Sequence, residues 1–154
     1  MKNRLFFLTL IFIAAIFPAC SQNNEQMQDG YYTAESSAYD VYGWKVFITI
    51  YISNNRITTV EYNAKNASGF SKSWDVEWMR KMKETVGTYP NKYIRAYADD
   101  LLNKQDPFKV NAIPGTGYSH DWFRLLAAAA IEQAKKGDKK IAFVDLPGLN
   151  GEEK

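Results

Sequence analysis

The part of the sequence best suited to binding chemistry is residues 110–119, where an apolar run enters a turn with Gly115 and Gly117. A helical pattern follows directly, and the first amides of a helix lack internal partners and attract phosphate or carboxylate groups. The glycines let the backbone approach an anion closely, while Thr116 and Ser119 supply hydroxyl donors. The same residue types also serve simply to cap a helix. The segment by itself therefore indicates either an anion site or a cap.

A second polar group, with Asn63, Lys72 and Ser73, precedes the first expected helix. Amide, ammonium and hydroxyl groups of this kind suit the carbonyl or phosphate oxygens of a ligand. The alternative is a solvated loop in which Ser73 is the N-cap of the helix. We keep both interpretations at this point.

Residue types for catalysis are sparse. His120, the single histidine, lies between Ser119 and Asp121, but adjacent residues on a helix point in different directions and do not build a triad. One histidine and one cysteine, Cys20, do not make a transition-metal site of the usual ligand type. We expect no catalytic residues and no metal, and hence a binding or electron-transfer protein rather than a turnover enzyme.

The clearest element is a strand over residues 43–52, followed by a second strand over 56–62. Residues 53–55, Ser-Asn-Asn, tolerate left-handed conformations and predict a hairpin turn between them. Apolar residues fall on both faces of the first strand, which predicts that both faces are covered. One face carries Val46, Ile48, Ile50 and Ile52, and the other carries Phe47, Thr49 and Tyr51.

The remaining pattern predicts helices packed on this sheet. One helix begins at Ser73 with Trp74 and Trp78 at core spacing, and the strongest helix covers residues 120–136. Further strands are expected, and their predicted ranges are 31–39, 108–113 and 139–146. Together these elements predict an α+β domain in which helices pack on a small antiparallel sheet.

The N-terminus has the pattern of a secretion signal. Lys2 and Arg4 precede an apolar run over residues 5–17 that is interrupted once, by Thr9. This run is shorter than the roughly 20 residues that a transmembrane helix needs. A basic start, a short apolar core and a small residue before the cleavage point predict a signal peptide over residues 1–19.

Residues 17–20, Phe-Pro-Ala-Cys, resemble the lipobox of bacterial lipoproteins. The resemblance implies that Cys20 carries acyl chains such as palmitate and anchors the protein on the extracytoplasmic face of the cell membrane or the outer membrane. The alternative is an ordinary signal followed by an unmodified cysteine. The polar residues 20–28 are interpreted as the lipidated tether, residues 29–146 as the domain and residues 147–154 as a loose tail.

Charge excludes one class of partner. The chain has 19 Lys and Arg against 17 Asp and Glu, and removal of Lys2 and Arg4 with the signal makes the two numbers equal. A neutral domain does not provide the dense phosphate neutralisation on which nucleic-acid binding depends. We expect no nucleic-acid partner.

Residues 111–119, Asn-Ala-Ile-Pro-Gly-Thr-Gly-Tyr-Ser, resemble the Asp-Ala-x-Ser/Thr-Gly-Ala-Thr-x-Ser motif of FMN-binding domains. Such domains occur in extracytoplasmic flavin lipoproteins and in the C and G subunits of sodium-pumping and Rnf-type redox complexes. The resemblance extends over roughly residues 29–138 and is closest to the membrane-anchored lipoproteins described as major membrane immunogens. The other matching segments are residues 29–35, 43–45, 56–63, 69–75, 104–105 and 125–134.

The motif departs from the family at the position that matters for covalent flavin. Family members attach FMN phosphate to the hydroxyl of the last Thr, and Gly117 stands there in this sequence. Asn111 and Pro114 are further departures. Thr116 or Ser119 would remain as a displaced acceptor. The resemblance thus implies an FMN-binding-type fold with FMN bound without a covalent bond. The implied binding residues are Gly115, Thr116, Gly117, Tyr118, Ser119, Asn63, Lys72, Ser73 and Trp44.

Two functions follow from this resemblance. The first is an electron carrier that binds FMN and receives electrons from a membrane redox donor. In such a protein the redox chemistry belongs to the flavin. The second is a surface lipoprotein that has lost flavin and uses the same scaffold for binding or interaction, as the loss of the acceptor at Gly117 favours.

Overall fold

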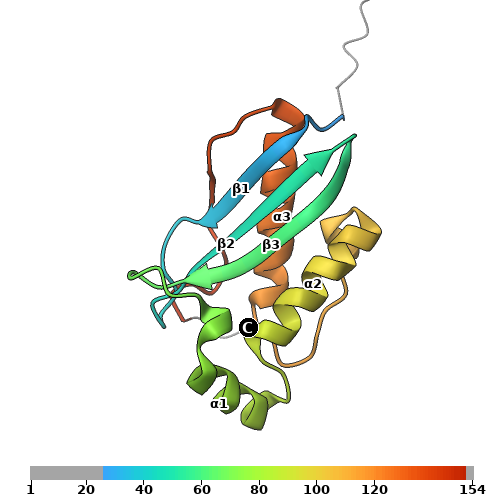
Figure 1. Cartoon of the computed structure of the whole chain (residues 1–154). Helices are drawn as coiled ribbons and strands as arrows, with labels where there is room; N and C mark the ends of the chain where they lie inside the picture. The colour runs from blue at the N-terminus through green and yellow to red at the C-terminus, as the bar shows by residue number, and fades with distance from the viewer. Residues whose placement is uncertain (1–25, 152–154) are drawn as a thin grey trace, which may run out of the picture.

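The structure is a computed structural model that describes residues 26–151, so the expected signal over residues 1–19 and Cys20 lie outside the described part. The fold is α+β, as the sequence predicts (Figure 1). Short 3₁₀ helices occur at Lys72–Trp74 and Pro107–Lys109. The strands and longer helices are β1 (Gly30–Ser36), β2 (Lys45–Ser53), β3 (Arg56–Lys65), α1 (Val76–Val86), α2 (Pro90–Lys104), α3 (Ser119–Lys136) and β4 (Ala142–Val144).

The sheet has the strand order β3-β2-β1-β4. Its first three strands are antiparallel, as predicted, while the short strand β4 is parallel to β1, so the sheet is mixed. The reason lies in α3, which ends beside the start of β1, where the amide of Gln28 donates to the carbonyl of Ala134 at 2.9 Å. The chain leaves α3 at that end of the sheet, so β4 runs in the same direction as β1.

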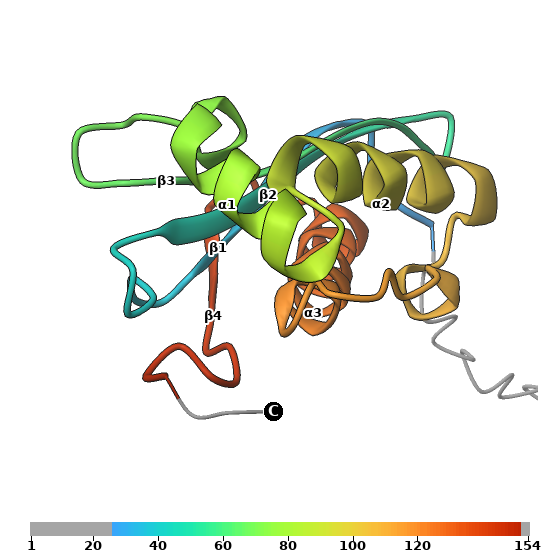
Figure 2. The same ribbon diagram turned by 90° about the horizontal axis from the view of Figure 1, so that it is seen from below.

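The core lies between one face of the sheet and two helices. α3 packs against β1 and β2, while α2 packs against β3 (Figures 1 and 2). The alternation predicted for β2 holds on this face, since its even-numbered apolar residues are buried. Burying such a side chain stabilises the fold by about 1.5–3 kcal/mol. The helices contribute fully buried residues, among them Tyr97, Leu101, Phe123 and Leu126.

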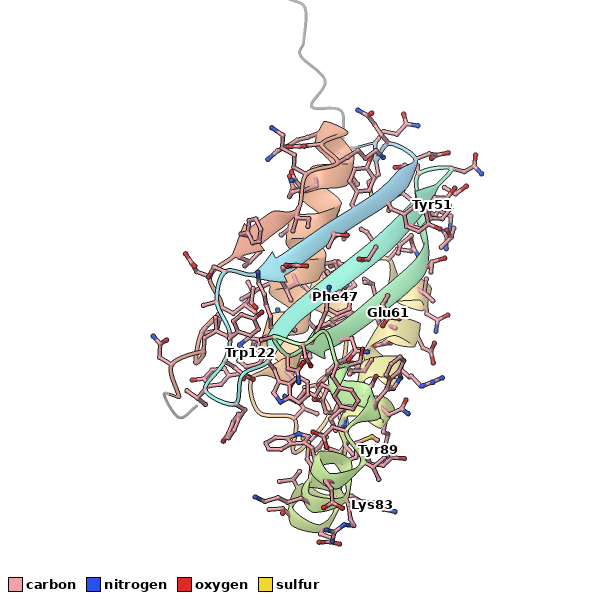
Figure 3. The ribbon with its side chains drawn as sticks, turned by 60° about the vertical axis from the view of Figure 1, so that its left-hand side comes forward. Phe47, Tyr51, Glu61, Lys83, Tyr89 and Trp122 are labelled. Carbon is pink, nitrogen blue, oxygen red and sulfur yellow. The ribbon has the colours of Figure 1, made fainter. Side chains whose placement is uncertain are left out.

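The opposite face of the sheet is not covered by a helix among the described residues, so the prediction of two covered faces was wrong. Figure 3 labels Phe47, Tyr51 and Glu61 on this face. Its side chains contact one another instead: the hydroxyls of Thr33 and Thr49 are 2.9 Å apart. An antiparallel sheet commonly packs one face on the core and leaves the other in water.

The hairpin turn between β2 and β3 is the one the sequence predicts. Asn54 and Asn55 adopt positive φ angles of 52° and 59°. Two successive left-handed residues form the turn that matches the twist of the flanking strands, and asparagine tolerates this region better than most residues.

α1 differs from its prediction in two ways. Its N-cap is Asp75, whose carboxylate accepts from the amide of Trp78 at 2.9 Å, so Ser73 is not the cap. None of its residues is buried, and Trp74 just before it is 69% exposed, so the prediction that its tryptophans lie in the core was wrong for Trp74. Helical spacing marks one apolar face but does not say what covers it. Figure 1 shows α1 at the end of the sheet opposite to the start of β1.

The strand predicted over residues 108–113 does not form. Asp106 caps a 3₁₀ helix by accepting from the amide of Phe108 at 2.9 Å, and Pro107 occupies its first turn. The extended residues that follow bond to α2 rather than to the sheet, since the amide of Asn111 donates to Asp100 at 2.7 Å. An apolar run after proline predicts extension but not a partner strand.

The residues after β4, interpreted from the sequence as a tail, pack on the domain as far as Gly151. Leu146 and Leu149 are buried, and the indole of Trp122 donates to the carbonyl of Pro147 at 2.6 Å. This segment returns to the start of α3 and contributes to the site described next. Among residues 26–151, no helix has both the length and the apolar character needed to cross a membrane.

Candidate functional site

A cavity of about 460 Å³ opens at the start of α3. Ligand pockets commonly have volumes of 300–1,000 Å³. Its walls come from the connection between β1 and β2, the 3₁₀ helix before α1, α1 itself, the turn before α3 and the residues after β4. The aromatic residues in the walls are Tyr42, Trp78, Tyr93, Tyr118 and Trp122, and the polar ones are Asp40, Lys72, Thr116 and Ser119.

Five of the nine residues implied by the family resemblance line this cavity: Lys72, Thr116, Gly117, Tyr118 and Ser119. The other four lie around it. Gly115 faces the C-terminal end of α1, where an added Cβ would lie 2.7 Å from the carbonyl of Val86. Asn63 donates to the hydroxyl of Ser73 at 2.8 Å, and Trp44 is buried with its ring 5.7 Å from the ammonium of Lys72.

Buried tyrosines hold the turn before α3 in place. The hydroxyl of Tyr62 donates to the carbonyl of Ser119 at 3.0 Å, and the side chain of Tyr93 is hydrogen-bonded to that of Ser119. Burial is the main cause that raises the pKa of Tyr62 well above its usual value and the pKa of Tyr93 to about 12. Both phenols are therefore neutral at physiological pH and act as fixed hydrogen-bonding groups.

Thr116 is fixed in the same way. Its hydroxyl donates to the carbonyl of Ile113 at 2.8 Å and lies 2.8 Å from the hydroxyl of Tyr97, and the residue is 6% exposed. Both bonding directions of the hydroxyl point into the protein. Thr116 is thus poorly placed to replace Gly117 as the acceptor of a covalent group.

The start of α3 provides donors to the cavity. The N-cap residue of this 18-residue helix is Tyr118, whose side chain makes no cap hydrogen bond. The amide of Ser119 bonds to the carbonyl of Thr116 at 3.0 Å, and the helical bonding then begins with the amide of Trp122, which donates to the carbonyl of Tyr118 at 2.9 Å. A helix start of this kind favours an anionic or carbonyl oxygen.

Among the residues that the structure describes, Lys72 is the one lysine on the wall of this cavity. The residue is 9% exposed, and its ammonium lies 3.9 Å from a carboxylate oxygen of Asp40 and 5.3 Å from the ring centre of Trp78. Burial lowers the pKa of Lys72, while the negative charges of Asp40 and Asp75 oppose this shift. Asp40 is itself fixed by the amides of Tyr42 and Trp44, each at 2.9 Å.

Two aromatic pairs form parts of the wall. The rings of Tyr118 and Trp122 are stacked, with centres 6.1 Å apart and an angle of 7° between their planes. The rings of Tyr42 and Trp78 lie 5.2 Å apart. A Cβ at Gly148 would run into the Tyr118 ring, so a glycine is required there for the ring to take this position. Flat apolar walls with a few polar groups suit a planar aromatic ligand.

No protein-family model matches the chain. The 15 kDa lipoprotein of Treponema pallidum is 31% identical over 128 residues, which cover 83% of this chain and 89% of that protein. The chain belongs to the family of this lipoprotein. The crystal structure of the CPE2226 protein from Clostridium perfringens is also similar, with 30% identity and a TM-score of 0.75, over 79% of this chain and 99% of that one.

Several cavity residues of this family member were not found from the sequence. Asp40, Tyr42 and Trp78 come from segments that were interpreted as a loop and as a core helix, and Gly148 comes from the expected tail. The Asp-Val-Tyr-Gly turn at residues 40–43 was a usable signal, since Asp followed by Gly marks a fixed turn. Among the described residues, no group of three or more His, Cys, Asp or Glu is placed to hold a metal ion.

Replacing Gly117 by threonine is expected to destabilise the protein by about 1–2 kcal/mol, because Gly117 has a left-handed φ of 54°. An added Cβ meets no atom within 4 Å, so the cost comes from the backbone and not from a clash. Urea unfolding measures the change. Gly117→Asn is the matched control, because asparagine tolerates this region, and it should cost less. Equal losses in the two variants would contradict the backbone explanation.

Proposed function

We propose that this lipoprotein is anchored to a membrane on its extracytoplasmic side, binds FMN without a covalent bond and carries electrons from a membrane donor. The observation that carries the proposal is the cavity of about 460 Å³ at the start of α3. This is the place where the resemblance to FMN-binding domains puts the phosphate of the cofactor. The membership of a lipoprotein family supports the membrane anchor.

The residues present fit FMN in three respects. The uncapped start of α3 favours a phosphate, the pairs Tyr118–Trp122 and Tyr42–Trp78 offer flat surfaces to a planar ring system, and Lys72 adds a donor inside the cavity. FMN supplies the redox chemistry when bound. The protein orients it and excludes water around it.

Covalent attachment is not part of the proposal. Gly117 lacks a side chain at the position of the family's acceptor, and the hydroxyl of Thr116 is bonded within the protein. The side chain of Ser119 interacts with the buried phenol of Tyr93. Reversible binding through the backbone amides of α3 remains, and it needs none of these hydroxyls.

The second candidate is a lipoprotein that binds no flavin and uses the same cavity or another surface for interaction. The replacement of the acceptor by Gly117 is the observation that favours it. The two candidates differ in one measurable property, the affinity for FMN.

Adding FMN to the purified protein is expected to quench flavin fluorescence at micromolar concentration, because the ring would stack on indole and phenol groups. After denaturation the protein should carry no flavin mass. Replacing Gly148 by alanine should abolish quenching, because the added Cβ displaces the Tyr118 ring into the cavity.

Gly69→Ala is the matched control for this titration. Gly69 and Gly148 have similar left-handed φ angles of 83° and 72°, but Gly69 lies in the loop after β3 with no atom within 4 Å of an added Cβ. The Gly69→Ala variant should quench flavin fluorescence as fully as the unmodified protein. Absence of quenching in the unmodified protein would favour the flavin-free candidate.

A further inference from the structure

The ammonium of Lys72 makes no hydrogen bond among the described residues, and it is open to the cavity. Its polar neighbour is the Asp40 carboxylate, 3.9 Å away, which is beyond hydrogen-bond length. Its other contacts are the faces of the Trp44 and Trp78 rings, with centres at 5.7 and 5.3 Å. An ammonium has three donors, and leaving them unpaired in a low-dielectric site is costly. Because Lys72 lines the cavity, an acceptor placed there would satisfy it.

Asp40 decides which acceptor suits Lys72. Its carboxylate is held in position, because one oxygen accepts hydrogen bonds from the amides of Tyr42 and Trp44 at 2.9 Å each. A phosphate bound to Lys72 would bring its two negative charges close to this fixed carboxylate. Like charges at short range repel strongly where water is excluded. A neutral carbonyl oxygen takes the hydrogen bond of Lys72 without this repulsion.

The cavity wall therefore has two polar regions that suit different ligand groups. At the start of α3 the side chain of the N-cap residue makes no cap hydrogen bond, and the positive end of the helix dipole suits an anionic group. The recess formed by Lys72, Asp40 and Trp78 has nearly balanced charge and one unsatisfied cationic donor. Burial also lowers the pKa of Lys72, which agrees with an ammonium that lacks a close partner.

We infer that the Lys72 recess binds the carbonyl oxygen of a planar heterocycle, while the anionic end of the same ligand binds at the start of α3. For the proposed ligand FMN, on which this inference rests, Lys72 would contact the ring system and not the phosphate. Lys72 is then a residue that selects the ring, and the α3 start is the element that selects the phosphate.

Comparing FMN with riboflavin, which has the same ring system without phosphate, tests this assignment. Lys72→Met removes the donor but keeps an unbranched side chain between the two indoles. We expect this variant to weaken the binding of FMN and of riboflavin by the same factor. The factor should be about ten- to hundredfold, as for the loss of one charged hydrogen bond. Fluorescence titration measures both affinities. Circular dichroism checks the fold, and Lys72→Leu, which also lacks a donor and should give the same losses, replaces the methionine variant if that one does not fold.

Lys83→Met is the matched control, because Lys83 is an exposed lysine of α1 that does not line the cavity (Figure 3). It should leave both affinities unchanged. A loss for FMN alone in Lys72→Met would overturn the inference and place the phosphate at Lys72. Unchanged affinities for both ligands would also overturn it. Failure of the unmodified protein to bind either flavin would instead remove the proposed function itself, and this inference with it.

Discussion

Replacing Phe123 by alanine is expected to lower the free energy of unfolding by about 3–5 kcal/mol. Phe123 is 0% exposed and lies where α3 meets the sheet and α2. Its ring contacts Tyr62 edge-on, with centres 4.9 Å apart, and lies 5.3 Å from the ring of Tyr97. Aromatic pairs of this kind add about 0.5–1.5 kcal/mol beyond the area they bury. Urea unfolding followed by tryptophan fluorescence measures the loss.

Leu125→Ala is the matched control for Phe123→Ala. Leu125 is on the same helix but is 37% exposed, so its truncation should cost much less. Helix propensity does not confuse the comparison, since alanine is the best helix former at both positions. Because domains are stable by only about 5–15 kcal/mol, the core variant should be close to unfolding at physiological temperature. Similar losses in the two variants would contradict the position of the core.

Raising the pH above about 10 is expected to unfold the protein steeply, because two buried tyrosines resist ionisation. Burial raises the pKa of Tyr93 to about 12 and that of Tyr62 well above its usual value. The unfolded chain loses these protons near pH 10, whereas the folded chain keeps them. Stability is therefore complete below pH 10 and falls as the pH rises toward the folded values. Tyr93 alone accounts for about 2 kcal/mol at pH 12.

Comparison with Tyr93→Phe isolates the contribution of this residue. Phenylalanine has no proton to lose, so between pH 10 and 12 the stability of the variant should fall less steeply, by about 1.4 kcal/mol per pH unit. Urea unfolding at stepped pH measures both slopes. The variant also loses the hydrogen bond to Ser119 and should be somewhat less stable at pH 8. Parallel curves for the two proteins above pH 10 would contradict the burial explanation.

Local sequence patterns predicted which residues form each helix or strand better than they predicted what that element packs against. The alternation in β2, the two asparagines of the hairpin and the alanine-rich helix α3 each depend on neighbouring residues, and all were found. The cap of α1 was placed two residues early, at Ser73 instead of Asp75, because both residue types accept from a helix amide. The expected strand over residues 108–113 does not form, because nothing in its own sequence specifies a neighbouring strand to pair with.

The same distinction applies to the cavity. Thr116 to Ser119 were predicted as a group, because a glycine turn before a helix is a local signal. Asp40 and Trp78 were missed, because their approach to Lys72 depends on how the β1–β2 connection and α1 fold against each other. The role of Gly148 could not be predicted either, since its partner Tyr118 is distant in sequence.

The cavity and the point where the chain enters the fold lie at opposite ends of β1. β1 begins at one end of the sheet, and α1 with the cavity lies at the other (Figure 1). Seven residues of strand span roughly 23 Å at about 3.3 Å per residue, which is nearly three Debye lengths in physiological salt. A lipid attached upstream of β1 would therefore place the cavity at the end of the domain away from the membrane, where headgroup charge is screened. An electron donor in the bilayer would need a part that projects this far, or a tether long enough for the domain to turn over.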